Sequence, residues 1–290
     1  MWFRRRRKRE NLTVEWFLRR HGYSRHIITG LKRTEDGIFR NGVRAWTSQA
    51  VHAGDVIETH LVETEPSDGI LPRPVPFSVV YEDDDILVVD KPADTPIHPS
   101  IGNYENTLAN GIAWYFEQKG EPFVYRCINR LDRDTTGLIV LAKHALSAAV
   151  LSQAMRSREI HRTYQAFALG ETAASGTIDA PIARLNGSLI QRTVDFASGE
   201  RSVTHYRTLA HCSVFSHLEL NLETGRTHQI RVHMAYIGHP LLGDTLYNKT
   251  PGTFPRQALH SASLSFVHPI TGEPLNFHAP LPEDMQNLLT

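Results

Sequence analysis

The sequence contains little cysteine, no long apolar run and no Gly-rich loop for a phosphate. Its 290 residues include only Cys127 and Cys212, which are far apart and form no Cys-x-x-Cys pair. This spacing excludes a disulfide framework and a zinc site built on paired cysteines. No stretch approaches the roughly 18 consecutive apolar residues that a membrane-spanning helix needs, and no apolar segment follows the basic N-terminus. We therefore expect a cytoplasmic protein that does not enter a membrane.

Histidine is abundant, but its spacing is not that of a metal site. Sixteen histidines are scattered along the chain, without a His-Glu-x-x-His motif. His228 and His233 are five residues apart on a predicted helix, a poor spacing for joint ligation. A dinucleotide-binding fingerprint is also missing. The sequence predicts neither a metal nor an organic cofactor.

Positive charge is concentrated at the beginning of the chain, although the formal net charge is zero. The basic run Arg4–Arg9 is followed by Arg19, Arg20, Arg25, Lys32 and Arg33, whereas acidic residues gather later, as in Glu82–Asp85. A basic block attracts polyanions and gives affinity that depends on salt but not on base sequence. For Arg4–Arg9 alone, a solvated tail without a partner is an equally good interpretation.

Residues 12–65, behind the basic tail 1–11, are predicted to form a small N-terminal α/β module. Gly22 ends a first amphipathic helix, and Ser24 is the expected N-cap of a second. Asn41-Gly42 then predicts a hairpin turn.

Two short basic helices before a hairpin resemble the RNA-binding module that a small-subunit ribosomal protein shares with several RNA-modifying enzymes. We expect the second helix to present Arg25, Lys32 and Arg33 to RNA. A generic helical mini-domain is the alternative.

Residues 66–76 contain four prolines without periodicity, which predicts a linker. From residue 77 to 290, strands predominate, with helices interspersed in no regular βαβ rhythm. Helices are expected around 107–119, 145–158 and 228–238. This pattern favours an α+β domain built on a mostly antiparallel mixed sheet.

A polar loop with the sequence INRLDRDTTG precedes a short apolar strand. It places Asp132 between Arg130 and Arg133 at the edge of a predicted sheet, where reactive groups are often held. From spacing alone, a surface loop with solvated charges is the favoured interpretation.

The same loop resembles the His-Arg-Leu-Asp-Arg-x-Thr-Ser-Gly signature of the RluA-type pseudouridine synthases. The strand HRTYQAFALG and the block LETGRTHQIRVHMAYIGHPLLGDTLYN resemble further segments of that family, as do ILVVDKPADTPIHPS and ALHSASLSFVHPITGE. The likeness extends in order from Phe77 to Pro282. It departs at two positions, where Asn129 replaces the usual histidine and Thr136 the usual serine.

The resemblance implies the pseudouridine synthase fold and a set of site residues. Asp132 would be the catalytic carboxylate, Arg231 its guanidinium partner and Tyr164 a ring in the uracil pocket. A guanidinium can hold a carboxylate through two parallel hydrogen bonds, which a lysine cannot do. Without the resemblance, Tyr164 would be a core tyrosine and Arg231 an ordinary phosphate-binding or surface arginine.

Four more residues are implied as RNA contacts. A uridine must be extruded from a helix before its glycosidic bond can be reached. Arg130 resembles the residue that the family inserts into the RNA. Arg133 would also bind RNA. Arg226 and His228 would shape the pocket or the RNA groove, with structural support as the equal alternative.

The implied activity is the isomerisation of specific uridines to pseudouridine in structured RNA by a monomer. Ribosomal RNA is favoured and transfer RNA is possible. Two alternatives stay open at this point. One is a non-catalytic RNA-binding or ribosome-assembly factor, which the departures at Asn129 and Thr136 favour. The other is a nucleoside hydrolase, which would release free uracil.

Overall fold

The computed structural model describes residues 12–61 and 67–290. The predicted basic tail 1–11 lies outside the described residues. So do residues 62–66, which contain the end of the predicted module and the first residue of the predicted linker.

The N-terminal part has the predicted order of two helices and a hairpin. Helices α1 (Val14–Arg20) and α2 (Arg25–Arg33) precede strands β1 (Ile38–Arg40), β2 (Val43–Arg44) and β3 (Ile57–Thr59). The predicted N-cap is confirmed, because the Ser24 side chain accepts a hydrogen bond from Ile27 N. The predicted turn is also confirmed, since Arg40 pairs with Val43 across Asn41-Gly42. The three strands form a small antiparallel sheet in the order β2-β1-β3.

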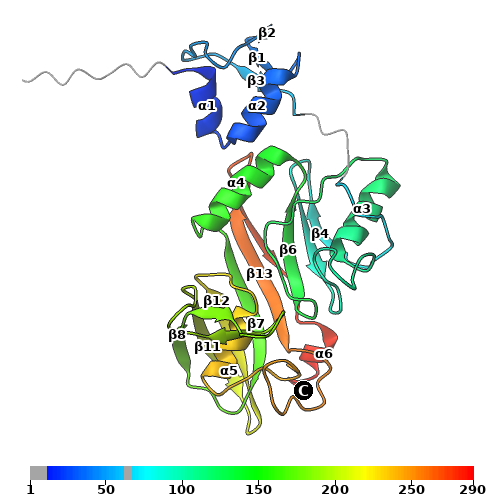
Figure 1. Cartoon of the computed structure of the whole chain (residues 1–290), viewed down its shortest axis with the longest axis vertical. Coiled ribbons are helices and arrows are strands. Elements are labelled where there is room, and N and C mark those ends of the chain that lie inside the picture. Colours follow the sequence, from blue (N-terminus) through cyan, green and yellow to red (C-terminus); the bar gives the residue numbers. More distant parts are fainter. Residues whose placement is uncertain (1–11, 62–66) are drawn as a thin grey trace, which may run out of the picture.

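This N-terminal part contacts helix α4 (Ala145–Arg156), as Figure 1 shows. Ala145 and Ala149 pack against its apolar cluster, which is centred on Leu18 and Ile38. A Cβ at Gly22 would lie 2.5 Å from Val150 Cγ2, so only glycine allows the approach. The contact fixes these two helices and the hairpin beside one end of the large sheet.

Nine strands form the large sheet, which is antiparallel at every pairing except the one between β6 and β13. The predicted α+β class with a mostly antiparallel mixed sheet is thus confirmed. Its main path is β4 (Ser78–Glu82), β5 (Ile86–Lys91), β6 (Thr136–Ala142), β13 (Leu259–Val267), β7 (His161–Leu169), β12 (Phe215–Leu222), β11 (Val203–His211) and β8 (Ser175–Asp179), with β14 (Pro274–His278) beside β13.

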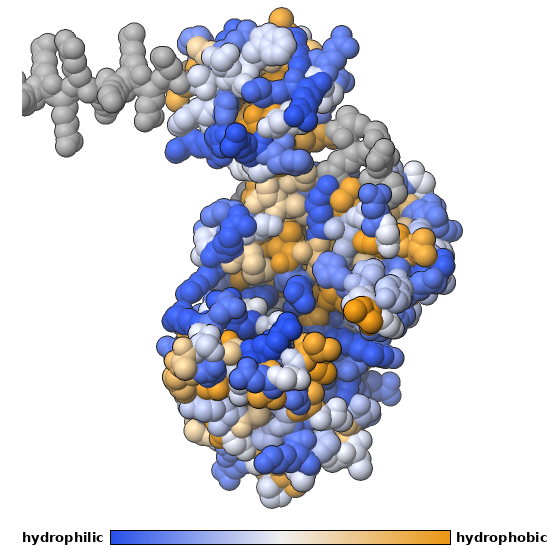
Figure 2. All heavy atoms as spheres, viewed as in Figure 1, coloured by the Kyte–Doolittle hydropathy of each residue, from blue (hydrophilic) through white to orange (hydrophobic). Residues whose placement is uncertain are grey.

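The remaining described elements cover the sheet or project from it. They are helices α3 (Leu108–Lys119), α5 (Gln229–Tyr236) and α6 (Glu283–Gln286), and the hairpin of β9 (Ile182–Arg184) and β10 (Arg192–Val194). Figure 1 shows α3 beside the β4–β6 half and α5 in the β7–β8 half. In the same view, hydrophilic residues gather where the two halves meet (Figure 2).

Strands β5 and β6 are buried on both faces. Leu87 and Ile139 belong to the core cluster that contains the apolar residues of α3, whereas Val88 and Val140 pack with Leu151 of α4. Such strands read as continuous apolar runs rather than alternating ones. The ends of this rigid pair are therefore well fixed positions for polar side chains.

Residues 67–76 form neither helix nor strand, and they lie against α3. Asn110 Nδ2 donates to Leu71 O, and Arg73 N donates to Asn110 O. Asn110 is buried at the start of α3, where it also completes a capping box with Thr107. The segment is thus attached to α3 through specific hydrogen bonds.

Both cysteines are free. Burial raises the pKa of the Cys127 thiol to about 12, which leaves it protonated at neutral pH. Cys212 is exposed. Among the described helices, none is long and apolar enough to cross a membrane.

Candidate active site

The loop from Asn129 to Thr135 carries Asp132 and is fixed from behind by the sheet. The buried Lys91 at the end of β5 donates from Nζ to Arg133 O over 2.8 Å and to Pro92 O over 2.7 Å. Arg256 Nη1 donates to Asp134 O over 3.1 Å. The backbone carbonyls of the two residues that follow Asp132 are therefore held by the buried side chains of Lys91 and Arg256.

Gly137 follows this loop at the point where β6 meets β13. It has a φ of 109°, and an added Cβ would lie 2.3 Å from Ser261 O. No other residue fits there without moving one strand, which explains the glycine in the motif. The close approach of the two strands sets where the Asp132 loop leaves the sheet.

Asp132 faces a buried guanidinium from α5. Arg231 Nη1 donates to Asp132 Oδ2 over 3.2 Å, and the Asp132 side chain keeps 22% of its surface exposed. Two parallel hydrogen bonds from Arg231 to Asp132 were predicted from the sequence, but the structure has one. The fork of Arg231 is directed at Asp244, with Nε to Oδ2 at 2.7 Å and Nη2 to Oδ1 at 2.8 Å.

The Asp244 carboxylate, which is fully buried, sets the direction of Arg231. Burial acts to lower the pKa of Arg231, but its hydrogen bonds to Asp244 and the negative charge of Asp132 raise it overall. Arg231 is thus a permanent cation that holds Asp244 through Nε and Nη2 and contacts Asp132 through Nη1. Asp244 follows Gly243, where the chain passes close to the backbone of Arg256. Only glycine fits at this position, because an added Cβ would lie 1.9 Å from Arg256 O.

His228 approaches the other oxygen of Asp132. Its Nε2 lies 3.9 Å from Asp132 Oδ1, and its Nδ1 lies 2.8 Å from the hydroxyl of Tyr247. Burial lowers the pKa of His228, so the ring is neutral at neutral pH. Asp132 is therefore flanked by a fixed cation on one oxygen and a neutral imidazole near the other.

Tyr164 of β7 completes a small cavity at Asp132. The cavity has a volume of about 50 Å³, and Leu131, Leu222 and Ile230 give it apolar walls. The ring of Tyr164 is buried, with 4% of the residue exposed. The three predicted catalytic residues Asp132, Tyr164 and Arg231 thus line one cavity, as do Arg130, Arg226 and His228.

A larger groove of about 470 Å³ adjoins this cavity. The two share Arg130, Tyr164, Leu222 and Arg226 as lining residues. Three further arginines line the groove: Arg156, Arg158 and Arg162. Arg162 Nε is buried without a hydrogen-bond partner within the described part of the chain. Five guanidinium groups make this groove suitable for a phosphate backbone.

The other predicted RNA contacts lie elsewhere. Arg133 is exposed and pairs with Asp94, with Nε to Oδ1 at 2.6 Å, and it does not line the Asp132 cavity. Arg25, Lys32 and Arg33 are exposed on α2, which belongs to the N-terminal part. Neither group lines the Asp132 cavity.

The two departures from the motif have structural partners. Asn129 is buried and bridges two backbone groups of β6, since Nδ2 donates to Leu138 O and Oδ1 accepts from Val140 N. The Thr136 hydroxyl is buried 2.9 Å from His260 Nδ1. Both side chains support the strand next to the Asp132 loop.

Four supporting residues had no role in the sequence prediction: Lys91, Asp244, Tyr247 and Arg256. All four are in segments that match the family blocks or directly beside them. Their residue types alone do not reveal partners that are between 13 and 122 residues away, as for Asp244 with Arg231 and Arg256 with Asp134. A buried lysine or arginine is the sign of such a partner, but burial is not visible in the sequence.

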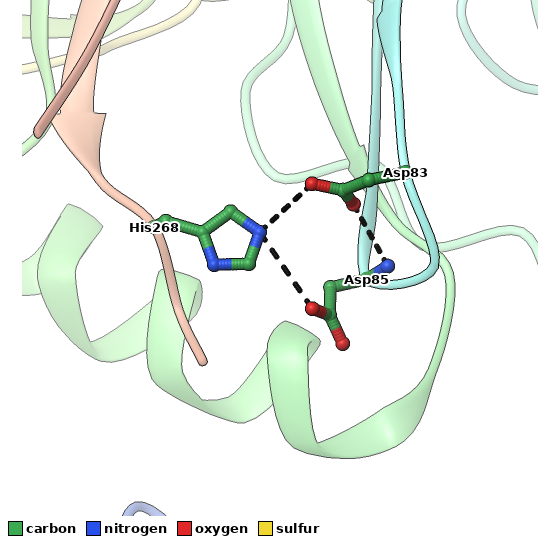
Figure 3. A group of neighbouring side chains, drawn as sticks. All are labelled: Asp83, Asp85 and His268. Atoms are coloured by element: carbon green, nitrogen blue, oxygen red, sulfur yellow. Dashed lines mark hydrogen bonds and ion pairs between the residues drawn. The ribbon is translucent and has the colours of Figure 1, made fainter. Parts of the chain in front are cut away.

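A second carboxylate cluster lies at the opposite end of β5. Asp83, Asp85 and His268 place ligand atoms within 4.8 Å of one another, which is the spacing of a possible metal site (Figure 3). However, His268 Nδ1 accepts from Ile270 N and Thr271 N, so the ring proton is on Nε2 and faces Asp83 at 3.0 Å. This protonation state suits a hydrogen bond and not a metal ligand.

Comparison with known proteins agrees with the geometry. Residues 85–236 match the family described as RNA pseudouridylate synthase. An uncharacterised RNA pseudouridine synthase of Bacillus subtilis is 39% identical over 96% of this chain and 98% of its own length. Ribosomal large subunit pseudouridine synthase D of Vibrio cholerae is 43% identical over 81% of this chain and 76% of its own.

Solved structures show the same fold. Human RNA pseudouridylate synthase domain containing 1 aligns with a TM-score of 0.60 and 26% identity, over 75% of this chain and 86% of its own. Domain containing 4 aligns with a TM-score of 0.61 at 22% identity, over 73% of this chain and 91% of its own, which supports the fold alone. With the matched family segment covering Asp132, Tyr164 and Arg231, the chain belongs to the RNA pseudouridine synthases of the RluA type.

Proposed function

We propose that this enzyme converts uridines of ribosomal RNA to pseudouridine with Asp132 as the catalytic carboxylate. One observation carries the proposal: Arg231 holds one oxygen of Asp132 while the other faces a cavity closed by Tyr164. Several similar proteins are named ribosomal large subunit pseudouridine synthase D, which favours ribosomal over transfer RNA.

The chemistry requires a fixed anion next to the sugar. The bond between ribose and a uracil nitrogen must break, the base must turn, and a bond to carbon must form, without redox change. A carboxylate can serve by attacking the sugar or by removing a proton from it. Both roles need the same arrangement, in which one oxygen is held by Arg231 and the other is open to the nucleotide.

Tyr164 would hold the detached uracil. Its ring is buried in the wall of the cavity that Asp132 and Arg231 also line. Stacking of a base on an aromatic ring contributes about 1–3 kcal/mol. A base held in this way cannot diffuse away before it rejoins the sugar.

Arg130 would take the place of the extruded nucleotide. It is exposed and lines both the Asp132 cavity and the adjoining groove. Unstacking a nucleotide costs a few kcal/mol. A planar guanidinium can stack on neighbouring bases and contact phosphate, which offsets part of this cost. Arg226 and the groove arginines would bind the flanking backbone.

The domain division belongs to this proposal. Residues 12–65 would be an RNA-binding module that uses Arg25, Lys32 and Arg33, residues 66–76 a linker, and residues 77–290 the catalytic domain. The exposure of these three basic side chains on α2 supports the first assignment. We also propose that the enzyme acts as a monomer in the cytoplasm, where its RNA is found.

The decisive experiment replaces Asp132 by asparagine. Wild-type protein and Asp132→Asn are incubated with transcripts of ribosomal and transfer RNA, and pseudouridine is mapped after carbodiimide treatment. We expect product formation by Asp132→Asn to fall by at least about a thousandfold, with RNA affinity preserved. Appreciable turnover by this variant would refute the assignment. Free uracil from the wild type would instead indicate a nucleoside hydrolase.

The non-catalytic alternative predicts that neither protein forms product on any RNA. Its only sequence support came from Asn129 and Thr136. Both side chains are engaged with the β6 backbone or with His260, away from the reacting oxygen of Asp132. A pseudouridine map of cells with and without the gene tests this alternative directly.

A further inference from the structure

We infer that Tyr247 is a positioning residue that holds His228 as a neutral Nε2–H donor aimed at Asp132. The inference deepens the proposed function and rests on it, because it concerns the group next to the reacting carboxylate. Tyr247 is absent from the Asp132 cavity lining, so its effect on the reaction is exerted through His228.

The hydrogen-bond pattern at the Tyr247 hydroxyl fixes the direction of its proton. Arg192 N, at the start of β10, donates to this oxygen over 2.9 Å. The other partner at 2.8 Å is His228 Nδ1. A backbone N–H cannot accept, so within the described part of the chain His228 Nδ1 is the acceptor available to the hydroxyl proton. The neutral imidazole then carries its own proton on Nε2.

The Nε2 atom points toward the open oxygen of Asp132. The separation of 3.9 Å from Oδ1 is longer than a hydrogen bond, whereas Arg231 already contacts Oδ2. A nucleotide oxygen entering between them would meet an N–H donor on one side and a carboxylate on the other. His228 is thus placed to orient the substrate relative to Asp132.

The backbone at His228 is strained, which supports a fixed role. His228 has a φ of 57°, a left-handed conformation that non-glycine residues seldom adopt, and it makes no side-chain cap bond to α5. Such conformations persist where the surroundings enforce them, and they concentrate at functional sites. The bond to Tyr247 is the polar contact that holds the ring in this position.

Tyr247 also contacts the cation that holds Asp132. Its ring lies 5.1 Å from the guanidinium carbon of Arg231, and its backbone N–H donates to Asp244 Oδ1. One residue therefore contacts both flanking groups of Asp132. The hydrogen bond from Arg192 N connects Tyr247 to the β9–β10 hairpin. A cavity of about 550 Å³ lies beside this hairpin, and Arg184 and Arg226 line it.

The charges around His228 determine the expected pH dependence. Its pKa is lowered first by burial and also by the positive charges of Arg231 and Arg192, while the charges of Asp132 and Asp244 raise it. Protonation must occur at Nδ1, where the Tyr247 hydroxyl proton opposes it. An imidazolium would pair with Asp132 Oδ1 and occupy the oxygen that the substrate needs. Activity should therefore fall at acid pH, and removal of the hydroxyl should move this loss to higher pH.

The test compares Tyr247→Phe with Tyr236→Phe, a matched control at an exposed position on α5. Single-turnover rates at saturating RNA are measured from acid to alkaline pH. We expect the single-turnover rate of Tyr247→Phe to be about tenfold lower than that of wild type at neutral pH. The fall in its rate at acid pH (the acid limb of the profile) should begin at a higher pH than in wild type. Its RNA affinity should stay within about twofold of wild type. Superimposable profiles of the two variants would overturn the inference, as would a loss confined to RNA affinity.

A second variant covers the case in which Tyr247→Phe does not fold. His228→Gln keeps an N–H donor that does not titrate, so we expect partial activity without the acid limb. His228→Leu lacks the donor and should be slower than His228→Gln at every pH. If His228→Gln retains the acid limb of the wild type, another group titrates there and the inference is wrong.

The third measurement does not depend on activity. Nitrogen NMR of ¹⁵N-histidine-labelled full-length protein reports the tautomer, and His228→Gln identifies the signal. Wild-type His228 should carry its proton on Nε2, and Tyr247→Phe should show a mixture of tautomers. A wild-type ring with its proton on Nδ1 would contradict the inference. If instead the wild type forms no pseudouridine while the tautomer is as expected, the proposed function fails and the geometry stands.

Discussion

The two ends of strands β5 and β6 each carry a carboxylate beside a histidine, but the protein uses the two carboxylates differently. At the end nearer the N-terminal part, Asp83 Oδ1 accepts from Asp85 N and Ile86 N, and Oδ2 accepts from Tyr81 Oη and His268 Nε2. At the other end, Asp132 has one contact at 3.2 Å and a histidine at 3.9 Å.

This difference separates a carboxylate with hydrogen bonds to both oxygens from one in which a single oxygen is held. The acceptor capacity of Asp83 is filled by neighbours in β4 and β5 or directly beside β5 and β13, so its hydrogen bonds stabilise the folded sheet. Asp132 is held on one side only, and the loop behind it is fixed by Lys91 and Arg256. A group that is rigid but incompletely satisfied can interact with a substrate without reorganisation.

The largest effect is expected for Asp244→Asn, which removes the charge that holds Arg231. Breaking a buried ion pair typically costs about 3–5 kcal/mol, because the remaining charge stays buried. Urea unfolding should show this loss, and pseudouridine formation should fall as well. Glu219→Gln is the control, since its pair with Arg207 is largely exposed. Equal stability of the two variants would show that Asp244 does not hold Arg231.

A smaller loss is expected for His268→Gln at the other end of β5. The variant weakens the hydrogen bonds among His268, Asp83 and Asp85, at a cost of about 1–3 kcal/mol in the free energy of unfolding. The single-turnover rate at saturating RNA should be unchanged. A His268→Gln variant that forms pseudouridine slowly but is as stable as wild type would contradict the proposed difference between the Asp83 and Asp132 ends of β5.

Lys91 should make stability depend on pH. Burial lowers its pKa to about 7, so above that pH the folded protein binds fewer protons at this group than the unfolded chain does. The free energy of unfolding should therefore rise by roughly 1 kcal/mol per pH unit between pH 7 and roughly 10. Urea titrations at several pH values should show this rise in wild type and in the exposed control Lys249→Met. The same rise in Lys91→Met would contradict the assignment.

The smallest effect is expected when Arg25, Lys32 and Arg33 are all replaced by serine. RNA affinity should fall by at most about tenfold, and the slope of log affinity against log salt should fall by about two. The rate at saturating RNA should not change, because α2 does not contribute to the Asp132 cavity. Unchanged affinity across a salt titration would remove the proposed role of these residues.

Local patterns predicted the helices, the hairpin turn and the class of sheet. Ser24 and Asn41-Gly42 act through neighbours within a few residues, so their effect can be read directly from the sequence. The motif match brought Asp132, Tyr164 and Arg231 together correctly in one cavity. Arg133 did not join them, because its side chain turns away to Asp94.

By itself the sequence determined the order of elements and the family, because these depend on local pattern and on a match to ordered motifs, and the same match predicted Asp132 as the catalytic carboxylate. Only the tertiary structure decided which oxygen of Asp132 stays open, that the fork of Arg231 is directed at Asp244, and that Tyr247 meets His228. Those features depend on burial and on contacts between distant segments, and neither is encoded in residue type or spacing.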